Sequence, residues 1–417
     1  MLTREQWDKE LEARKWLSKA MKREALRGNQ GYGRYVLEQT EKGLKDVIEL
    51  SPGTYRWSIR PSKLVIDAAK KAMEEGYTEY AFGTGLKEFR NAIAEKLQRD
   101  NDIKADPETQ ITPTSGCTHA FDLILRVLVD PGDEVLMIDP DYGLYYSKLA
   151  EHDAKVVPVP LKEPDKPAGH WTFDPSDLEK RVTPKTKMFV FSNGNNPTGM
   201  LYGKKEIEEI AEIATKKDIL VVADELYERL TFDGREHYSI ASFPGMEDRT
   251  ITLMGFSKVQ AMSGFRVGFM VANKEITRYL KAQVAHTVEC VNTIGQMAAI
   301  AAMSPEMNLW VKEVIQELTK RRNYAVSRLN NMRGITCGTP MGCFFMFPNT
   351  SALGKSQDVA EFFLREAKIR VPVGTNYGPI NGEGHIRVTF AAGWDRLAQG
   401  LDAMNKAAEK LMTQKQE

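Results

Sequence analysis

A lysine among apolar residues is the position in this sequence with the clearest capacity for chemistry. The stretch GFSKVQAMSGFRVGF covers residues 255–269 and contains Lys258, with Arg266 eight positions later. An ammonium group in an apolar site is costly unless something uses it. The composition of this stretch therefore makes Lys258 a candidate functional residue.

A carboxylic acid and a tyrosine follow a second apolar run. VVADELY, residues 221–227, carries Asp224 to the end of a predicted strand and places Tyr227 three residues later. An acid at the end of a buried strand needs a partner. Because ligands of open α/β sheets gather at the carboxyl ends of the strands, these two residues are candidates for a binding site.

Three loops rich in small or turn-forming residues follow other predicted strands. TSGCTHA at 114–120 ends a strand and opens a helix, an arrangement whose free backbone N–H groups and positive dipole end can hold a phosphate. DPDYGLY at 139–145 and NGNNPTG at 193–199 follow the next strands. Taken one at a time, each loop is more typical of ordinary turn chemistry than of a site.

Short apolar runs alternate with helical patterns along most of the chain. The runs QITPTS, DEVLMIDP, KMFVFSN and DILVVAD are separated by stretches with apolar residues at helical spacing. This alternation predicts an α/β fold with a mainly parallel sheet sandwiched by helices. A long helical stretch near 306–332 and the strand candidates CFFMFP and HIRVTFA predict a smaller α+β domain.

We therefore predict two domains and an arm. A chain of 417 residues exceeds the size at which single cores usually stop growing. The predicted boundaries are 1–62 for an amino-terminal helix and arm that lies partly in the small domain, 63–305 for the large domain, and 306–417 for the small carboxyl-terminal domain. ELSPGTYRWSIRPS, at 49–62, is broken by Pro and Gly and predicts the extended arm.

Charge and composition exclude several classes of protein. Lys plus Arg equals Asp plus Glu at 57 each, so the chain has no global field to attract nucleic acid or an anionic membrane. The charged amino terminus does not resemble a secretory signal, and no run of about 18 apolar residues predicts a membrane span. The four scattered cysteines lack zinc-ligand spacing. We expect a soluble, cytoplasmic protein without a metal site, with small-molecule partners and no nucleic-acid or membrane partner.

The order of these motifs resembles a known family. A phosphate-cradle loop, an aromatic residue, Asn-Pro-Thr-Gly, Asp-x-x-Tyr, and a Lys followed eight residues later by Arg are similar to the fold type I pyridoxal-phosphate enzymes, specifically the class I and II aminotransferases of the aspartate aminotransferase-like superfamily. The segment around Lys258 fits the family pattern at every position. The resemblance covers about residues 45–410 and implies pyridoxal 5'-phosphate as cofactor, bound by the large domain.

The resemblance implies a role for each residue near the cofactor ring. Lys258 would form the Schiff base with the cofactor aldehyde and, once released, would move the substrate α-proton as general base and acid. Asp224 would pair with the protonated pyridine nitrogen. Tyr227 and Asn196 would hydrogen-bond the ring O3′, and Tyr142 would stack on the ring face.

Further residues are implied for the phosphate and for a second subunit. Arg266 and the backbone of Gly116, Cys117 and Thr118 would hold the phosphate, for which a guanidinium offers a planar fork of donors. Tyr80, in YTEYAFGTG, matches the family tyrosine that reaches the phosphate of the neighbouring subunit. The resemblance therefore implies a homodimer with shared active sites.

The substrate contacts implied by the resemblance are fewer. Arg387, in GHIRVTFAAG, matches the arginine that binds the substrate α-carboxylate, which Asn196 also approaches, and Gly53 matches a position where backbone comes close to the substrate. Some bacterial aspartate aminotransferases carry a lysine for the distal carboxylate where this chain has Thr118. Arg56 or Trp57 on the arm could replace that lysine or could simply be surface residues.

Four other residues near these motifs have a structural and a functional interpretation. We expect His119, beside the phosphate loop, to be a packed histidine, because a lone His rarely marks a site without partners. Gly342, Phe344 and Phe345 resemble the family strand that lines the small-domain side of the pocket. Core packing explains them equally well.

The favoured function is that of an aminotransferase that moves the α-amino group of an L-amino acid, acidic or aromatic, to a 2-oxo acid. A lyase or decarboxylase on the same cofactor is the alternative, since pocket geometry decides which bond breaks. A ligand sensor of this fold is less favoured, because such regulators carry an added DNA-binding module and fewer than 50 residues precede the fold here.

Two proline bonds follow predicted strands next to expected cofactor contacts. We expect Asp139–Pro140 and Asn196–Pro197 both to be cis, because the chain must reverse sharply there and X-Pro bonds make the cis form accessible. The resemblance implies cis bonds at the same two places.

Overall fold

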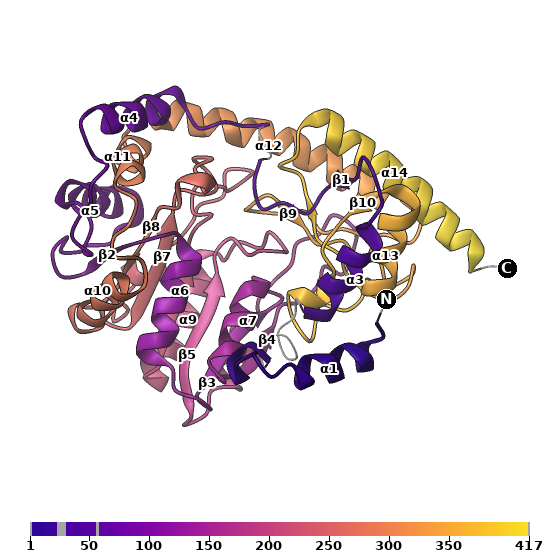
Figure 1. Cartoon of the computed structure of the whole chain (residues 1–417), viewed down its shortest axis with the longest axis horizontal. Helices are drawn as coiled ribbons and strands as arrows, with labels where there is room; N and C mark the ends of the chain where they lie inside the picture. Colours follow the sequence, from indigo (N-terminus) through magenta and orange to yellow (C-terminus); the bar gives the residue numbers. More distant parts are fainter. Residues whose placement is uncertain (1, 23–30, 56–57, 416–417) are drawn as a thin grey trace.

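The apolar runs of the sequence form a seven-stranded sheet. The computed structural model describes residues 2–22, 31–55 and 58–415. The strand order is β2-β8-β7-β6-β5-β3-β4 (Figure 1). The strands are β2 (Ile111–Thr114), β3 (Glu134–Asp139), β4 (Lys155–Pro160), β5 (Thr186–Ser192), β6 (Leu220–Asp224), β7 (Thr250–Gly255) and β8 (Gly268–Val271).

Most strand pairs in this sheet are parallel, as the alternating pattern predicted. From β4 through β3, β5 and β6 to β7 every neighbouring pair is parallel, and β8 runs antiparallel to both β7 and β2. The carboxyl ends of β3, β5, β6 and β7 therefore meet at one edge of the sheet. Sequence inspection did not single out β4, β7 and β8.

Helices cover both faces of the sheet. Val135 and Met137 of β3 belong to one hydrophobic cluster, and Leu136 and Ile138, which point the other way, belong to a second. The first cluster includes residues of α4 (Lys63–Glu74), α5 (Lys87–Asn101), α6 (Cys117–Leu128), α7 (Gly143–Glu151), α10 (Lys274–Val288) and α11 (Thr293–Ala302). The second includes residues of α8 (Pro175–Glu179) and α9 (Lys204–Lys217). The α/β sandwich predicted from the sequence is confirmed.

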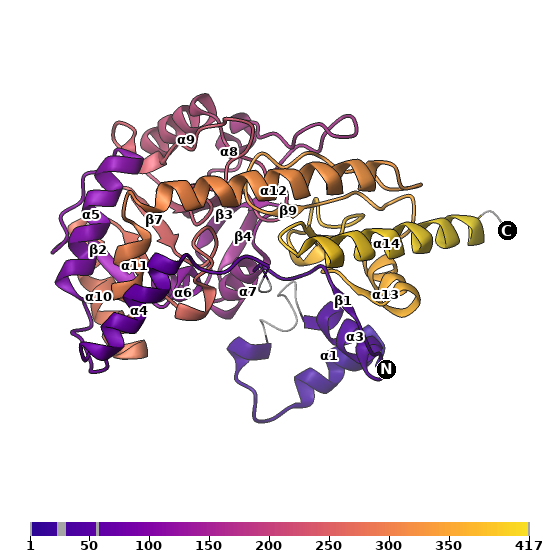
Figure 2. The ribbon, with the colours of Figure 1, turned by 90° about the horizontal axis from the view of Figure 1, so that it is seen from above.

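The carboxyl-terminal part of the chain surrounds a third hydrophobic cluster. The long helices α12 (Met307–Asn330) and α14 (Trp394–Gln414) lie side by side here, with α13 (Ser356–Ala367) against α14 (Figure 2). These helices and two short strand pairs contribute residues to the cluster. β9 (Phe345–Met346) pairs antiparallel with β11 (Val388–Thr389). β1 (Ile48–Glu49) pairs parallel with β10 (Ile369–Arg370), so the amino-terminal arm joins this part of the molecule. The remaining elements are α1 (Arg4–Ala13), α3 (Gly31–Glu41), η1 (Ile240–Ser242), η2 (Ser263–Phe265) and η3 (Gly374–Asn376).

The domain boundaries at 62/63 and 305/306 stay a prediction. The third cluster draws mainly on residues between 311 and 408 and on Leu37, Leu50 and Tyr55 of the amino-terminal segment. It also includes Tyr227 and Val259, which follow strands of the large sheet. The hydrophobic packing is thus continuous across the proposed boundary.

One of the two predictions of a cis proline bond is wrong. Asp139–Pro140 is cis, but Asn196–Pro197 is not, and the second cis bond of the described chain joins Asn193 to Gly194. The turn at Pro197 is closed by the Asn195 side chain, whose Oδ1 accepts hydrogen bonds from Thr198 N at 3.1 Å and Thr198 Oγ1 at 2.6 Å. A side-chain-closed turn of this kind reverses the chain without a cis bond.

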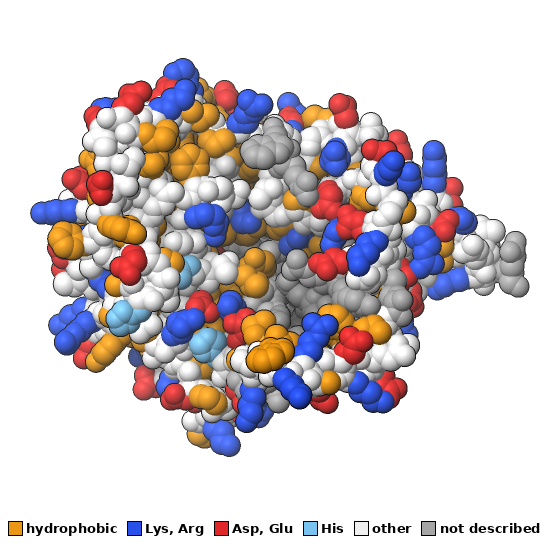
Figure 3. Space-filling model, in the orientation of Figure 1, with side chains coloured by type: hydrophobic (Ala, Val, Ile, Leu, Met, Phe, Trp, Pro, Cys, Tyr) orange, Lys and Arg blue, Asp and Glu red, His pale blue; other side chains and the backbone are white. Residues whose placement is uncertain are grey.

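The surface has no strong charge bias on the face shown in Figure 3. Lys and Arg side chains are interspersed there with Asp and Glu side chains. Among the described residues, no helix combines the length and the apolar character needed to cross a membrane. The mixed charges on this face agree with the equal numbers of basic and acidic residues in the sequence.

A buried ion pair connects α5 to the turn after β6. Lys96 Nζ lies 2.5 Å from both carboxylate oxygens of Glu228 and donates to Asn101 Oδ1 at 2.6 Å. The side chains of Lys96 and Glu228 are only 6% and 14% exposed. Because Glu228 directly follows Tyr227, this ion pair holds the end of the segment that contains Asp224 and Tyr227 against α5.

Replacing Lys96 alone should therefore destabilise the protein strongly. Lys96→Met leaves Glu228 buried without its cation, and we expect the free energy of unfolding to fall by about 3–5 kcal/mol. The double variant Lys96→Met with Glu228→Leu should recover most of this loss, since an apolar pair can replace a buried ion pair. Urea titration measures both values, and a single variant that loses less than about 1 kcal/mol would contradict the interpretation.

Candidate functional site

A cavity of about 300 Å³ lies at the sheet edge where the parallel strands end. It brings together residues that are far apart in the sequence, from the arm, from the loops after β2, β3, β5, β6 and β7, and from the turn before β8. Nine of the residues predicted from the sequence line it: Gly53, Cys117, Thr118, Tyr142, Asn196, Asp224, Tyr227, Lys258 and Arg266.

Lys258 projects into this cavity from the segment after β7. Its Nζ donates a hydrogen bond to the carbonyl oxygen of Gly53 at 2.8 Å. The same nitrogen lies 5.8 Å from the centre of the Tyr227 ring and 5.7 Å from that of Phe344. Burial, and then the nearby Arg387 cation, lower the pKa of Lys258 to about 8. A substantial fraction of this amine is therefore neutral near physiological pH.

Asp224 is the last residue of β6 and is 6% exposed. Its Oδ2 accepts a hydrogen bond from the Tyr145 hydroxyl at 2.6 Å, and its Oδ1 accepts one from Leu226 N at 3.0 Å. Burial raises the pKa of Asp224, while these two hydrogen bonds act in the opposite direction. The carboxylate is thus held in one orientation beside the cavity.

Tyr145 was not predicted from the sequence. It lies three positions after Tyr142, at a helical spacing that places both rings on the same side of α7. The two rings meet edge to face with centres 5.2 Å apart. That spacing was the available signal for a second functional tyrosine.

Tyr227 and Asn196 present polar groups toward the same space. The Tyr227 hydroxyl is buried and has no hydrogen-bond partner among the described residues. Asn196 is 6% exposed and accepts a hydrogen bond from Arg387 Nη1 at 3.0 Å. A buried hydroxyl without a partner is costly, so the Tyr227 oxygen is poised to bond a ligand.

The loop between β2 and α6 forms a cradle beside Arg266. Gly116 precedes the helix with a φ of 86°, and a Cβ at this position would come within 2.7 Å of Arg266 Nη2. Arg266 donates hydrogen bonds to the carbonyl oxygens of Ser115, at 3.1 Å, and Ser263, at 2.9 Å. The first N–H groups of a helix lack intrahelical partners. Together these groups can hold an anion.

Arg387 reaches the site from the carboxyl-terminal part of the chain. Its guanidinium donates to Asn196 Oδ1 and, at 2.6 Å, to the carbonyl oxygen of Ser51. Its Cζ lies 3.9 Å from the centre of the Phe345 ring and 5.0 Å from that of Tyr377. Arg387 Nε is buried and has no partner in the described part of the chain. Sequence inspection missed Ser51 and Tyr377, because only the folded chain brings them to Arg387.

The remaining sequence-based candidates have different positions. Tyr80 does not line the cavity, and its side chain is 84% exposed in the single chain. His119 is held by hydrogen bonds, since Nδ1 accepts from Ser115 N at 3.1 Å and Nε2 lies 2.8 Å from Thr287 Oγ1. Burial lowers the pKa of His119. This is the environment of a packed histidine.

The MGCFFMFP segment borders the site through two aromatic rings. Phe344 and Phe345 are fully buried, so they pack in the core and also border Lys258 and Arg387. Gly342 lies against Gly194, since a Cβ added to Gly342 would be 3.7 Å from the Cα of Gly194. Arg56 and Trp57 lie outside the described residues.

Known proteins resemble this chain in both sequence and structure. Residues 45–400 match the family model described as aminotransferase class I and II. The aspartate aminotransferase of Pyrococcus abyssi is 37% identical over 89% of this chain and 94% of its own length, and the aromatic-amino-acid aminotransferase 2 of Thermococcus litoralis is 35% identical over 88% and 93%. The solved structure of the alanine aminotransferase from Pyrococcus furiosus superposes with a TM-score of 0.86, at 31% identity, over 94% of this chain and all of that one.

The lowered pKa of Lys258 predicts an unusual pH dependence for its reactivity. Only the neutral amine attacks an aldehyde, so capture of formaldehyde at Lys258, trapped with cyanoborohydride, should rise about fivefold from pH 7 to pH 8 and level off above pH 9. Peptide mass spectrometry measures the modified fraction. In the urea-denatured chain the same lysine should keep gaining reactivity to about pH 10. Equal profiles in the two states would contradict the pKa shift.

Proposed function

The chain belongs to the family of class I and II aminotransferases and is therefore a transaminase. From this family membership we propose a role for each residue of the site. The α-amino group of an L-amino acid would pass to a 2-oxo acid, with pyridoxal 5'-phosphate held at Lys258. The observation that carries this proposal is the convergence of the Lys258 amine, the Asp224 carboxylate and the Arg387 guanidinium on one region.

The relatives reported above are all named as aminotransferases, which agrees with the favoured function and gives no support to a lyase, a decarboxylase or a ligand sensor. Their names differ in the amino acid, with aspartate, aromatic amino acids and alanine all represented. The family therefore leaves the substrate side chain open. We propose acidic or aromatic L-amino acids as the first to test.

The described residues fit pyridoxal phosphate. The cradle of Gly116, Cys117 and Thr118, together with Arg266, suits a phosphate group. The unpartnered hydroxyl of Tyr227 suits a ring oxygen. When bound, this cofactor supplies an electron-withdrawing ring that takes up the electron pair left when the substrate Cα loses its proton.

Asp224 would act on the ring nitrogen of the cofactor. A buried carboxylate stabilises a proton on a nearby nitrogen, because the two opposite charges attract strongly where water is excluded. Tyr145 and Leu226 N fix the orientation of this carboxylate. We propose that Asn196 joins Tyr227 at the ring oxygen and that Tyr142 lies on the ring face.

Lys258 would move the proton of the substrate Cα. Its neutral amine accepts a proton, and the resulting ammonium can return it at a neighbouring carbon. A pKa of about 8 suits this exchange, because the group then passes readily between its two forms near neutral pH. The carbonyl oxygen of Gly53, which accepts a hydrogen bond from Lys258 Nζ at 2.8 Å, would orient the amine within the cavity.

Arg387 would bind the α-carboxylate of the substrate. Its guanidinium offers the planar fork that a carboxylate accepts in a bidentate pair. The Phe345 ring, 3.9 Å from Arg387 Cζ, and the carbonyl oxygen of Ser51 hold the fork in place. We infer that the amino acid lies between Arg387 and Lys258, with Gly53 close to it.

We also propose a cytoplasmic homodimer in which Tyr80 reaches the phosphate site of the neighbouring subunit. The proposal is supported by the exposure of Tyr80 and Phe82, at 84% and 87%, since large aromatic side chains seldom remain so exposed without a partner. No nucleic-acid or membrane partner is proposed.

The half-reaction tests the proposed function directly. An amino acid should convert the aldehyde form of the bound cofactor to its amine form, seen as a change in absorbance, and a 2-oxo acid should reverse it. Acidic, aromatic and aliphatic L-amino acids should be screened in parallel. A bound cofactor that no amino acid converts would refute transamination.

Lys258→Ala should abolish turnover and leave a folded protein that still binds the cofactor non-covalently. The substitution removes the proton-transferring amine but leaves the phosphate cradle and Asp224 in place. Circular dichroism and cofactor absorbance check the fold and the binding. Substantial transamination by the purified variant would be incompatible with the role given to Lys258.

Asp224→Asn should slow the half-reaction by about a hundredfold or more while the cofactor stays attached to Lys258. A neutral amide no longer holds the proton on the ring nitrogen, so the charge that develops at Cα loses its stabilisation. Stopped-flow absorbance measures the rate. A near-normal rate would show that Asp224 only stabilises the end of β6.

A further inference from the structure

The end of β3 is joined to a loop of the carboxyl-terminal part by a buried carboxylate. Asp139 closes β3 and is fully buried. Its Oδ1 accepts a hydrogen bond from Asn381 N at 2.8 Å, and its Oδ2 accepts one from Ile380 N at 3.0 Å. The Asn381 side chain donates in return to the carbonyl oxygens of Asp139, at 3.0 Å, and Leu161, at 2.9 Å. We call this set of contacts the Asp139 clamp.

The loop is shaped around this carboxylate. A Cβ at Gly378 would lie 2.5 Å from both carboxylate oxygens of Asp139, so a larger residue there would displace the group. Burial raises the pKa of Asp139, and only hydrogen bonds from Asn381, Ile380 and Tyr146 act against it. A buried carboxylate that depends on backbone N–H groups is costly to keep, which indicates that the contact has a specific use.

The residue held next to the clamp is Tyr377. Its carbonyl oxygen accepts a hydrogen bond from Asp141 N at 2.8 Å, and its side chain is buried. Its ring centre lies 5.0 Å from Arg387 Cζ. Tyr142 lines the cavity one residue after Asp141. The short segment from Asp139 to Tyr142 thus contacts both the cofactor side and the substrate side of the site.

We propose that Asp139 is a positioning residue for substrate binding. Its carboxylate fixes the loop 377–381, and the loop holds the Tyr377 ring against Arg387 so that the guanidinium is oriented before the substrate arrives. Asp139 acts through Tyr377 and does not line the cavity. The proposal rests on the substrate-binding role proposed above for Arg387.

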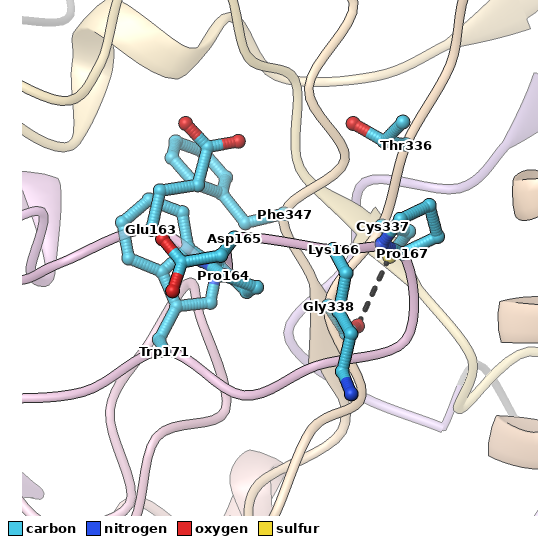
Figure 4. A pocket seen from close by; sticks show the side chains of 10 residues that line it. All are labelled: Glu163, Pro164, Asp165, Lys166, Pro167, Trp171, Thr336, Cys337, Gly338 and Phe347. Carbon is cyan, nitrogen blue, oxygen red and sulfur yellow. Dashed lines mark hydrogen bonds between the residues drawn. The ribbon is translucent and has the colours of Figure 1, made fainter.

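A second contact between the same two parts of the molecule offers a matched control. Segments 162–171 and 336–347 lie against each other around a pocket of about 90 Å³, where Figure 4 shows Glu163, Trp171 and Phe347 on one side. Glu163 Oε1 accepts a hydrogen bond from Asn349 Nδ2 at 2.9 Å and lies 3.2 Å from His385 Nε2. Glu163 is thus another carboxylate that bridges the two parts.

Asp139→Asn tests the proposal with little change in size. One carboxylate oxygen becomes an amide nitrogen, which cannot accept from Ile380 N or Asn381 N. In the cofactor-loaded enzyme, hydrogen exchange at the amides of residues 380 and 381 should become about tenfold faster. The KM for both the amino acid and the 2-oxo acid should rise about tenfold, with kcat within about twofold and the cofactor absorbance unchanged.

Glu163→Gln should leave both KM values within about twofold of the wild-type values, because its contact is partly solvent-exposed. An equal rise in KM in this control would overturn the proposal, since the effect would then be general loosening. Unchanged KM in Asp139→Asn with faster exchange would also overturn it.

If Asp139→Asn does not fold, the milder Asn381→Ala removes only the side-chain donors of the clamp. It should raise KM about threefold, and unchanged KM there would count against the proposal. The half-reaction of the wild-type enzyme separates this idea from the proposed function. If the wild-type enzyme does not carry out the half-reaction, both the proposed function and the role of Asp139 are refuted. If it does, only the comparison of KM values between the wild type and the variants can refute the role of Asp139.

Discussion

The partial burial of the Lys258 amine is the constraint on which the rest of the site depends. Burial lowers the pKa of this amine to about 8, and the positive charges of Arg387 and Arg266 add to the effect. The negative charge of Asp224 acts in the opposite direction and raises this pKa. The protein must therefore hold cations and a carboxylate close together in a partly buried space, where each charged group loses some of its hydration at a cost in free energy.

The fold meets this constraint by using two parts of the chain. The parallel strands bring Asp224 and the segment of Lys258 to one edge of the sheet, where loops can surround a small cavity. Arg387 and the Phe345 ring beneath it come from the carboxyl-terminal part, and Ser51 and Gly53 come from the arm. Because no single segment supplies the whole environment of Lys258, the contacts between the two parts belong to the site as much as the side chains that line it.

Residues in short motifs were predictable, and residues that act across the fold were not. Asp224 and Tyr227 stand at the end of an apolar run and Lys258 stands among apolar residues, so their polarity is conspicuous, and the structure brings them together. Tyr377 carries no such signal, because its contact with Arg387 depends on the path of a distant loop. The prediction of a cis bond at Asn196–Pro197 was wrong, because hydrogen bonds to the Asn195 side chain close that turn. The presence of a proline in the sequence does not reveal which of these two ways the chain uses to reverse its direction.

The pairing of β1 with β10 has a consequence for the order in which the chain can fold during synthesis. Ile48 aligns with Ile369, and Leu50 is fully buried in a cluster built mainly from residues after 311. All seven strands of the large sheet leave the ribosome before Ile369 is made. The arm must therefore wait, with its apolar residues exposed, until nearly the whole chain is present. An interruption of translation after Val271 but before Ile369 leaves the strands of the sheet complete and the arm without its partner strand, which exposes the arm to aggregation.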